Sequence, residues 1–482
     1  MKRAVHSFLL SLVLVSVSVA QTIQTTPPAP SAPRSVSFPK PGDQHLSNGL
    51  RVIVVERHDT PLVTAALVIK NGGEVDPAQL AGVADMTANL LAKGTTTRSA
   101  TRIANEVESL GGILESEAQW DATNVSVGVM SDKIASAMAL ISDVVRHPTF
   151  RSDEIERLRQ EYLDSFTLAL GEPASLARFV GAKVVYGDGL YGHAILGTLE
   201  SLKRISRADI LKIHRQYYRP DNAILVLGGD INQDAGFTLA KRFFGDWLKP
   251  QTKMPALAPL ETADHGGRVI VIDKPDAGQS AVFLVRRGIS RNDNHYYQGI
   301  VTNSVLNGYS GRLNQEIRIK RGLSYGAGSA LEARRATGPF VASAQTKNES
   351  GAEVATLLIK EVERLSTEPP PIPELTPRKA VLIGEFSRGL ETVNGLVGRV
   401  SALAVYELSL DEINRYINSV EGVNTTDIQQ FATSKLDAKS SSVIIVGNAK
   451  LFLSDLQKRF PNVEIIPFAE LDLNTRSLRK KK

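Results

Sequence analysis

The sequence predicts an α+β protein with two homologous domains, each a largely antiparallel sheet with helices packed on one face. Near the start of each half, RVIVVER at 51–57 matches RVIVIDK at 268–274. Near the end of each half, AILVLGG at 223–229 matches SVIIVGN at 442–448. The offsets are 217 and 219 residues. A nearly constant offset over so long a stretch indicates an internal duplication.

The elements between these strands follow from hydrophobic periodicity. A second strand is predicted in each half, TAALVIKNG at 64–72 against AVFLVRRG at 281–288, because apolar residues run between polar turns. Alternation in NVSVGVM predicts a strand over 124–130. Apolar residues at helical spacing, ending at glycine in the first two cases, predict helices over 78–93, 101–110, 133–145 and 153–170. Strand pairs separated by pairs of helices predict helices packed on one face of a largely antiparallel sheet, which is the α+β class.

Length and composition narrow the classes of function. A chain of 482 residues exceeds what one hydrophobic core supports, which favours two or more domains. The absence of cysteine excludes disulfide frameworks, cysteine nucleophiles, thiolate zinc sites and iron–sulfur clusters.

The net charge of +5 comes from the two ends of the chain. The first twenty residues carry +2 and residues 476–482 carry +5, which leaves −2 for residues 21–475. A nucleic-acid binder is expected to carry a basic stripe on its folded part, so no nucleic-acid partner is predicted. The basic end is expected to be a solvated, frayed terminus, with contact to an anionic surface as the alternative.

The chain divides into six parts by composition. Two positive charges, an apolar run and small residues before position 21 are typical of a secretory signal peptide, and no later segment is apolar enough to span a membrane. We therefore predict an exported protein, by default in a bacterial periplasm. The predicted parts are a signal peptide (1–20), a proline-rich arm (21–45), a first domain (46–248), a linker (249–267), a second domain (268–470) and a basic tail (471–482).

Three stretches together resemble the insulinase/pitrilysin-like metallopeptidases. They are LSNGLRVIVVERHDTPLVTAALVIKNGGEVD near the start, VYGDGLYGHAILGTLESLKRIS with the following YYRPDNAILVLGGDI, and SGRLNQEIRIKRGLSYGAGSAL in the second half. The resemblance covers residues 46–470. It implies two homologous domains that form half of a clam-shell, the other half coming from a partner chain.

The zinc motif of that family is missing. Active members carry H-x-x-E-H on the first helix after the opening hairpin, where two histidines bind zinc and the glutamate activates water. In GVADMTANLLAKGT, Asp85 and Asn89 stand at the histidine positions and Ala88 at the glutamate position. The third ligand, a glutamate in the family, falls near Ser165, next to Asp164. No metal is therefore predicted in this chain, and Asp85 and Asn89 are expected to be polar residues lining a relic cleft.

Histidines elsewhere do not replace the motif, because none of those after the signal peptide lies three to five residues from another. His193 is interpreted as a turn or packing residue. The loop LNGYSGRL lacks the phosphate-binding pattern G-x-x-x-x-G-K-[ST]. Its Gly308 and Gly311 are expected to allow a tight turn where substrate or a partner's backbone passes close.

The second domain keeps an arginine and a tyrosine that also belong to the family's active site, as the resemblance implies. Arg318 and Tyr325 stand seven residues apart in IRIKRGLSYG. The resemblance implies that this pair faces the zinc site, binds substrate and stabilises the oxyanion. The structural alternative is that Arg318 pairs with Glu316 or Glu332 while Tyr325 packs a turn.

These features lead to one preferred function and two alternatives. The preferred hypothesis is the non-zinc subunit of an exported heterodimeric metallopeptidase, inactive alone. It would supply Arg318 and Tyr325 to a homologous zinc-bearing partner that cleaves peptides or unfolded polypeptides, held as an added strand on the sheet edge. The main alternative is a catalytically silent structural or binding homologue. An independent hydrolase with oxygen ligands to a metal is the least favoured, and a homodimer would contain no zinc motif.

Overall fold

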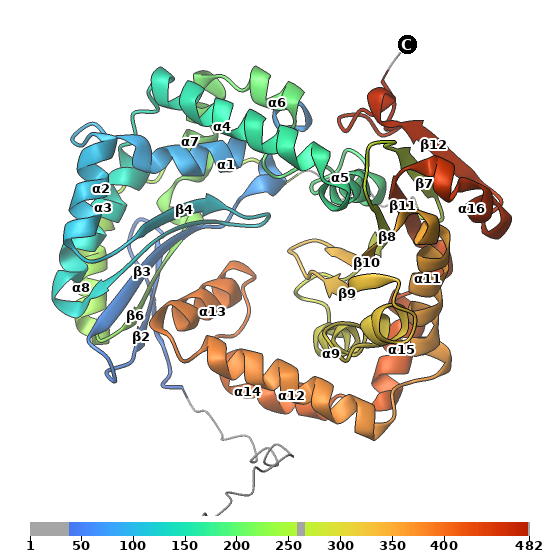
Figure 1. The fold of residues 1–482 in the computed structure, drawn as a ribbon. Coiled ribbons are helices and arrows are strands. Elements are labelled where there is room, and N and C mark those ends of the chain that lie inside the picture. Colours follow the sequence, from blue (N-terminus) through green and yellow to red (C-terminus); the bar gives the residue numbers. More distant parts are fainter. Residues whose placement is uncertain (1–37, 258–265, 481–482) are drawn as a thin grey trace, which may run out of the picture. The chain divides into compact units, whose positions relative to one another are not determined.

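The computed structural model describes residues 38–257 and 266–480, and it contains two six-stranded sheets (Figure 1). The predicted signal peptide, most of the proline-rich arm and the middle of the linker lie outside these residues. No helix in the described part of the chain is long and apolar enough to cross a membrane.

The first sheet has the order β1-β2-β6-β3-β5-β4. Only the β2–β6 pair is parallel, and the other neighbours are antiparallel. Its strands are β1 (Gly42–His45), β2 (Arg51–Glu56), β3 (Leu62–Ile69), β4 (Leu114–Ala118), β5 (Thr123–Met130) and β6 (Ala223–Gly229). Residues 42–45, predicted as the end of the extended arm, thus form an edge strand.

The second sheet has the order β12-β7-β11-β8-β10-β9. Its strands are β7 (Val269–Asp273), β8 (Ser280–Arg287), β9 (Ser324–Leu331), β10 (Pro339–Thr346), β11 (Ser442–Gly447) and β12 (Val463–Pro467). The order β2-β6-β3-β5-β4 of the first half reappears as β7-β11-β8-β10-β9. The predicted α+β class, the strand pairs and the two homologous halves are confirmed.

The first half has the following helices, which lie on the outer side of its sheet except for α5. They are α1 (Val83–Leu90), α2 (Ala100–Ser109), α3 (Ile134–Arg146), α4 (Ser152–Gly171), α5 (Pro173–Tyr186), α6 (Leu199–Arg204), α7 (Arg207–Tyr217) and α8 (Gln233–Phe244). The helix predicted over 78–93 starts instead at Val83. Gly82 takes a left-handed φ of 93°, which separates a short 3₁₀ turn from the α-helix.

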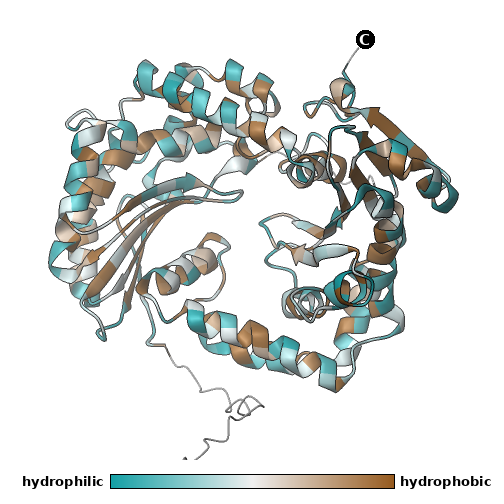
Figure 2. Cartoon of the chain, viewed as in Figure 1, coloured by the Kyte–Doolittle hydropathy of each residue, from teal (hydrophilic) through white to brown (hydrophobic). Residues whose placement is uncertain are grey.

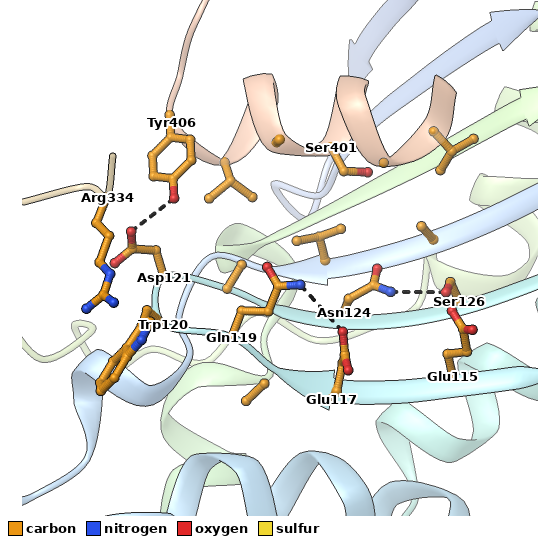
Figure 3. Close-up of a pocket in the computed structure, with 18 of the residues that line it drawn as sticks. Glu115, Glu117, Gln119, Trp120, Asp121, Asn124, Ser126, Arg334, Ser401 and Tyr406 are labelled. Carbon is orange, nitrogen blue, oxygen red and sulfur yellow. Dashed lines mark hydrogen bonds between the residues drawn. The ribbon is translucent and has the colours of Figure 1, made fainter. Parts of the chain in front are cut away.

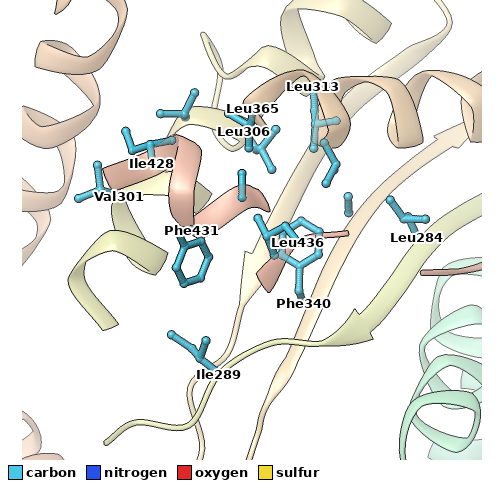
Figure 4. Packing of buried hydrophobic residues seen from close by; sticks show 14 of the residues in the cluster. Leu284, Ile289, Val301, Leu306, Leu313, Phe340, Leu365, Ile428, Phe431 and Leu436 are labelled. Atoms are coloured by element: carbon cyan, nitrogen blue, oxygen red, sulfur yellow. The ribbon is translucent and has the colours of Figure 1, made fainter. Parts of the chain in front are cut away.

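The second half has a corresponding set of helices, of which α13 does not pack on its own sheet. They are α9 (Tyr296–Leu306), α10 (Arg312–Asn314), α11 (Gly351–Thr367), α12 (Ile372–Gly389), α13 (Val393–Val405), α14 (Glu412–Gly422), α15 (Thr425–Lys435) and α16 (Leu453–Arg459). The strands are mostly apolar, and the helices turn polar faces outward (Figure 2). Figure 4 shows part of the core that results, where Phe340 of β10 and Phe431 of α15 lie among aliphatic side chains of α9 and α11.

The two halves exchange one helix each. Helix α13 of the second half packs on β3 and β6 of the first sheet, and α5 of the first half packs on β8 and β11 of the second (Figure 1). Val397 of α13 comes close to the sheet at Gly228, where an added Cβ would lie 2.5 Å from its Cγ2. Each sheet therefore buries its second face only when the other half is folded.

A buried carboxylate also joins the halves. Asp121, in the β4–β5 turn, accepts hydrogen bonds from the hydroxyls of Tyr191 (2.6 Å) and Tyr406 (3.1 Å) and from the backbone N–H of Arg335 (2.7 Å). The Arg335 guanidinium continues into the first half and donates to Glu74 and to the Asp121 carbonyl. Tyr406 and Arg335 belong to the second half, so this cluster ties the two halves together.

The prediction of a frayed basic end is wrong for its described part. Leu478 is fully buried in the cluster that contains Tyr191 and Ile466. The backbone N–H of Lys480 donates to the Glu470 carbonyl, and the Arg479 guanidinium bonds Glu470 and the carbonyl of Ile465. A buried leucine and these hydrogen bonds hold the segment, and a count of charges does not reveal either.

Candidate functional site

Helix α1 holds the residues that replace the zinc motif. It follows Gly82, and the Asp76 carboxylate accepts from the backbone N–H groups of Gly82 (2.6 Å) and Ala84 (2.9 Å) at its first turn. The helix packs between strand β4 and helices α4 and α7. The residues at the former zinc-motif positions of α1 are therefore surrounded by these neighbouring elements.

The carboxylate of Asp85 is buried and fully engaged. It accepts hydrogen bonds from the Tyr162 hydroxyl (2.5 Å), the Asn89 amide (3.2 Å) and the backbone N–H of Ala118 (3.2 Å). Only 4% of Asp85 is exposed, and this burial raises its pKa to about 6. The expectation that Asp85 lines a relic cleft is wrong, because the buried carboxylate forms a hydrogen-bonded network with the half-buried Asn89 and Tyr162.

Ala88, where the family has its catalytic glutamate, is completely buried. It packs with Ala84 of the same helix and Ala118 of β4 in a small apolar cluster. Its carbonyl accepts a bond from the Ser116 hydroxyl at 2.6 Å. Helix and strand pack closely here through small side chains, and the methyl group of Ala88 cannot act as a base.

The residues present do not fit a zinc ion. The Asp85 oxygens are already bonded to three donors, and the amide of Asn89 is a weak ligand. Asp164 and Ser165, near the predicted third-ligand position, are exposed, and Asp164 bonds Gln160 of its own helix. The α4 residue that reaches Asp85 is Tyr162, which the sequence analysis missed although it lies one helical turn from Ser165. Within the described residues, no group of three histidine, aspartate or glutamate side chains is arranged to hold a metal.

The buried Asp85 predicts a distinct pH dependence of stability. Its pKa rises from the ordinary 3.8 to about 6 in the folded state, so its contribution is fully present below pH 4 and is lost as the pH rises through 6. We expect wild type to lose about 2 kcal/mol of unfolding free energy from this group between pH 4 and 7. Urea denaturation across that range should show this component in wild type and not in Asp85→Asn. If the free energy of unfolding changed with pH in the same way in both proteins, the raised pKa of Asp85 would be contradicted.

Arg318 and Tyr325 lie on the surface of the second half. Arg318 is in the π-helical turn η6 (Gln315–Ile319), and Tyr325 is the second residue of β9 at the sheet edge. Tyr325 is 88% exposed, so it does not pack a turn. The Arg318 guanidinium lies 5.5 Å from the ring centroid of Tyr309, which is itself exposed.

The carboxylates expected to neutralise Arg318 are bonded to other residues. Glu316 pairs with Lys320 and Arg321, and Glu332 pairs with Arg334. Among the described residues, no carboxylate forms an ion pair with Arg318. The alternative of a structural ion pair with Glu316 or Glu332 is therefore wrong, and the guanidinium is available to an external group.

His193, Gly308 and Gly311 have the local packing and turn roles that the sequence predicted. His193 packs edge-on against Trp120 at 5.1 Å between ring centroids, with its Nε2 3.5 Å from an Asp76 oxygen. Gly308 has a φ of 84°, and an added Cβ on Gly311 would lie 2.3 Å from the Asn307 carbonyl oxygen. The loop before Arg318 therefore makes the predicted tight turn.

One pocket, of about 690 Å³, lies between the first sheet and α13 (Figure 3). Glu115 and Glu117 of β4 point into it beside Asn124 and Ser126 of β5. A second pocket of about 450 Å³, between the second sheet and α5, has a mostly apolar lining. The pockets share four lining residues, Trp120, Ile195, Glu332 and Arg334. The duplication has thus produced two adjoining compartments, one acidic and one apolar.

Sequence comparison relates both halves to one group of peptidases. Residues 51–170 match the family described as "Insulinase (Peptidase family M16)", and residues 204–376 match "Peptidase M16 inactive domain". An uncharacterised zinc protease of Mycobacterium leprae is 24% identical over 401 residues, covering 83% of this chain and 90% of that protein. One of Bacillus subtilis is 23% identical over 390 residues, covering 80% and 94%.

Solved structures show the same fold. A peptidase M16 inactive domain from Pseudomonas fluorescens aligns with a TM-score of 0.79 at 26% identity, covering 84% of this chain and 98% of that one. A protease from Helicobacter pylori aligns with a TM-score of 0.79 at 21% identity, covering 85% and 100%. Together with the two matching regions and the degenerate α1 motif, these likenesses establish that the chain belongs to the insulinase (M16) peptidase family and is a member without the zinc motif.

Proposed function

We propose that this chain is the zinc-free subunit of a two-chain exported metallopeptidase. A homologous partner with an intact H-x-x-E-H motif would hold the zinc, and this chain would supply Arg318 and Tyr325 to that site. The observation that carries the proposal is the contrast between the lost zinc motif of α1 and the retained pair Arg318 and Tyr325. The α1 motif is closed by Ala88 and the Asp85 network, whereas Tyr325 is exposed and the half-buried Arg318 has no carboxylate partner among the described residues.

The chemistry of the two side chains suits this role. A guanidinium stays protonated at any working pH, and a neutral phenol donates one hydrogen bond. Both would donate to the oxygen of the scissile carbonyl, where negative charge develops during attack by water. The partner's zinc, when bound, would supply the activated water. The Tyr309 ring beside Arg318 would limit the directions in which the guanidinium points.

The alternative is a catalytically silent structural or binding homologue. In that case Arg318 and Tyr325 would have no counterpart in a partner's site. The buried Asp85 network is compatible with either function, because it shows only that this chain's own zinc chemistry is lost.

Metal analysis of a purified pair separates these functions. The chain is co-expressed with a homologue from the same organism that carries H-x-x-E-H, and the chain alone and the co-purified complex are analysed by mass spectrometry for zinc. We expect no stoichiometric zinc in the isolated chain and one zinc per complex. Stoichiometric zinc in the isolated chain would overturn the interpretation of Asp85, Ala88 and Asn89, and failure to form a complex would favour the silent homologue.

A further inference from the structure

The pocket between α5 and the second sheet is an internal duplicate of the pocket between α13 and the first sheet. Each helix packs on the sheet of the other half and lines one of the two pockets (Figure 1). Three pairs of identical lining residues stand 220 positions apart: Ala182, Val185 and Tyr186 on α5, and Ala402, Val405 and Tyr406 on and directly after α13. The two pockets therefore share one pattern, and the residues that differ set the chemistry of each.

The strands below the two helices differ in polarity. In the first pocket Glu117 of β4 pairs across the sheet with Asn124 of β5. At the same place in the second pocket, Ala330 of β9 pairs with Val341 of β10. The other carboxylate of the first pocket is likewise replaced by a glycine, Gly328. The duplicated pocket thus has an apolar surface where the first pocket is acidic.

The second pocket has a buried apolar end and an exposed charged end. Tyr186 and Tyr191 are buried, and their hydroxyls donate to a backbone carbonyl (3.0 Å) and to Asp121 (2.6 Å), so their rings offer apolar surface. Arg178 stands eight residues before Tyr186 on α5, about 12 Å along the helix, and it is exposed. It takes the place that Gly398 has on α13.

The other charged groups at this pocket are already engaged. Arg334 pairs with Glu332, and its guanidinium lies 4.5 Å from the ring centroid of Trp120. His193 packs edge-on against the same ring. Among the described carboxylate and guanidinium groups that line the pocket, only Arg178 has no opposite partner. The pocket therefore combines an apolar interior with one available positive charge at its rim.

We propose that this pocket binds a free fatty acid of medium chain length, with its tail between α5 and the second sheet and its carboxylate on Arg178. The cavity of about 450 Å³ has room for about 15 water-sized atoms, enough for the chain of a ten- to twelve-carbon acid. A guanidinium binds a carboxylate through two parallel N–H donors. The site goes beyond the proposed function, because it requires neither the zinc-bearing partner nor cleavage.

The lining favours a hydrocarbon tail over a peptide. The pocket lies on the face of the second sheet, where β8 and β10 each pair with strands on both sides. Their backbone groups are therefore used within the sheet. A peptide in this cavity would bring its own N–H and C=O groups into apolar surroundings without partners, which is costly. A polymethylene chain has no such groups, and a cationic amphiphile would be repelled by Arg178.

Calorimetric titration of the isolated full chain with decanoate, below its micelle concentration, tests the head-group contact. We expect one saturable site per chain. Arg178→Gln should weaken decanoate binding at least tenfold, because a charge-assisted contact is lost, and should change the binding of the neutral decanol less than twofold. Arg215→Gln removes an exposed arginine of α7 that has no ion pair among the described residues, and as the matched control it should change decanoate binding less than twofold.

The duplication supplies a second variant that tests the location of the tail. Ala330→Glu gives the second pocket the carboxylate that the first pocket has at Glu117, and position 330 is exposed, so the fold should tolerate it. We expect decanoate binding to weaken at least tenfold. Ile113→Glu, at a position that is 75% exposed, is the control and should leave binding unchanged.

Three results would overturn the proposal. They are the absence of a saturable decanoate site, unchanged binding in Arg178→Gln or Ala330→Glu, and equal competition by an acetylated, amidated leucine–valine dipeptide. Thermal unfolding of each variant verifies that a loss of binding is not a loss of fold. None of these measurements involves Arg318 or Tyr325, so their outcome is separate from that of cleavage by the pair.

Discussion

Replacing Arg318 by alanine in the two-chain enzyme is expected to lower kcat/KM about a hundredfold, through kcat more than through KM. The reason is that a guanidinium aimed at the scissile carbonyl bonds the developing oxyanion more strongly than the ground-state oxygen; loss of one such donor typically costs 10²–10³ in rate. Tyr325→Phe removes one hydroxyl donor and is expected to cost about tenfold to a hundredfold. Cleavage of quenched fluorescent peptides by the purified pair measures both effects.

A neighbouring arginine provides the control for this experiment. Arg321 is exposed and lies in the same turn region, but its guanidinium is bonded to Glu316. Arg321→Ala should change kcat/KM less than threefold. Thermal unfolding of the three variants should stay close to wild type, because Tyr325 is exposed and Arg318 forms no ion pair among the described residues. Full activity of Arg318→Ala in the pair would exclude the catalytic role.

The second large effect is expected on stability. Asp121→Ala should lower the free energy of unfolding by about 3 to 5 kcal/mol, because it leaves two tyrosine hydroxyls and one backbone N–H without their shared acceptor. The Arg335 guanidinium would remain held by Glu74 and backbone carbonyls but would lose the turn that positions it. Urea denaturation followed by circular dichroism gives the difference.

Asp132→Ala is the matched control for Asp121. The Asp132 side chain is 67% exposed and forms one ion pair, with Lys133. Such surface pairs contribute little, so the change should stay below about 0.5 kcal/mol. A loss of less than 1 kcal/mol in Asp121→Ala would show that the Asp121 cluster does not hold the halves together.

The strands and the duplication could be predicted because both are visible in the apolar pattern of short sequence segments. The apolar runs at 223–229 and 442–447 are fully buried strands, and comparison of the two halves required only a nearly constant offset. The exchange of α5 and α13 could not be predicted in the same way. An apolar helix shows that it is buried, but its pattern does not say which sheet buries it.

The sequence predicts which zinc-motif residues are replaced, but it does not predict which residues the replacements contact. The replacement of the motif by Asp85, Ala88 and Asn89 is visible in the sequence. Its physical consequence depends on Tyr162, which is 77 positions away from Asp85 and reaches it only because α4 packs on α1. The burial of Leu478 likewise depends on tertiary packing that a count of basic residues does not contain.

The most direct test of the central claim is an activity titration. A fixed amount of the zinc-bearing partner is mixed with increasing amounts of this chain, and the rate of cleavage of a quenched peptide library is followed. We predict negligible cleavage by either chain alone and a rate that rises and reaches a plateau at one equivalent of this chain. A partner that is fully active alone, with a rate that does not change on addition of this chain, would contradict the account.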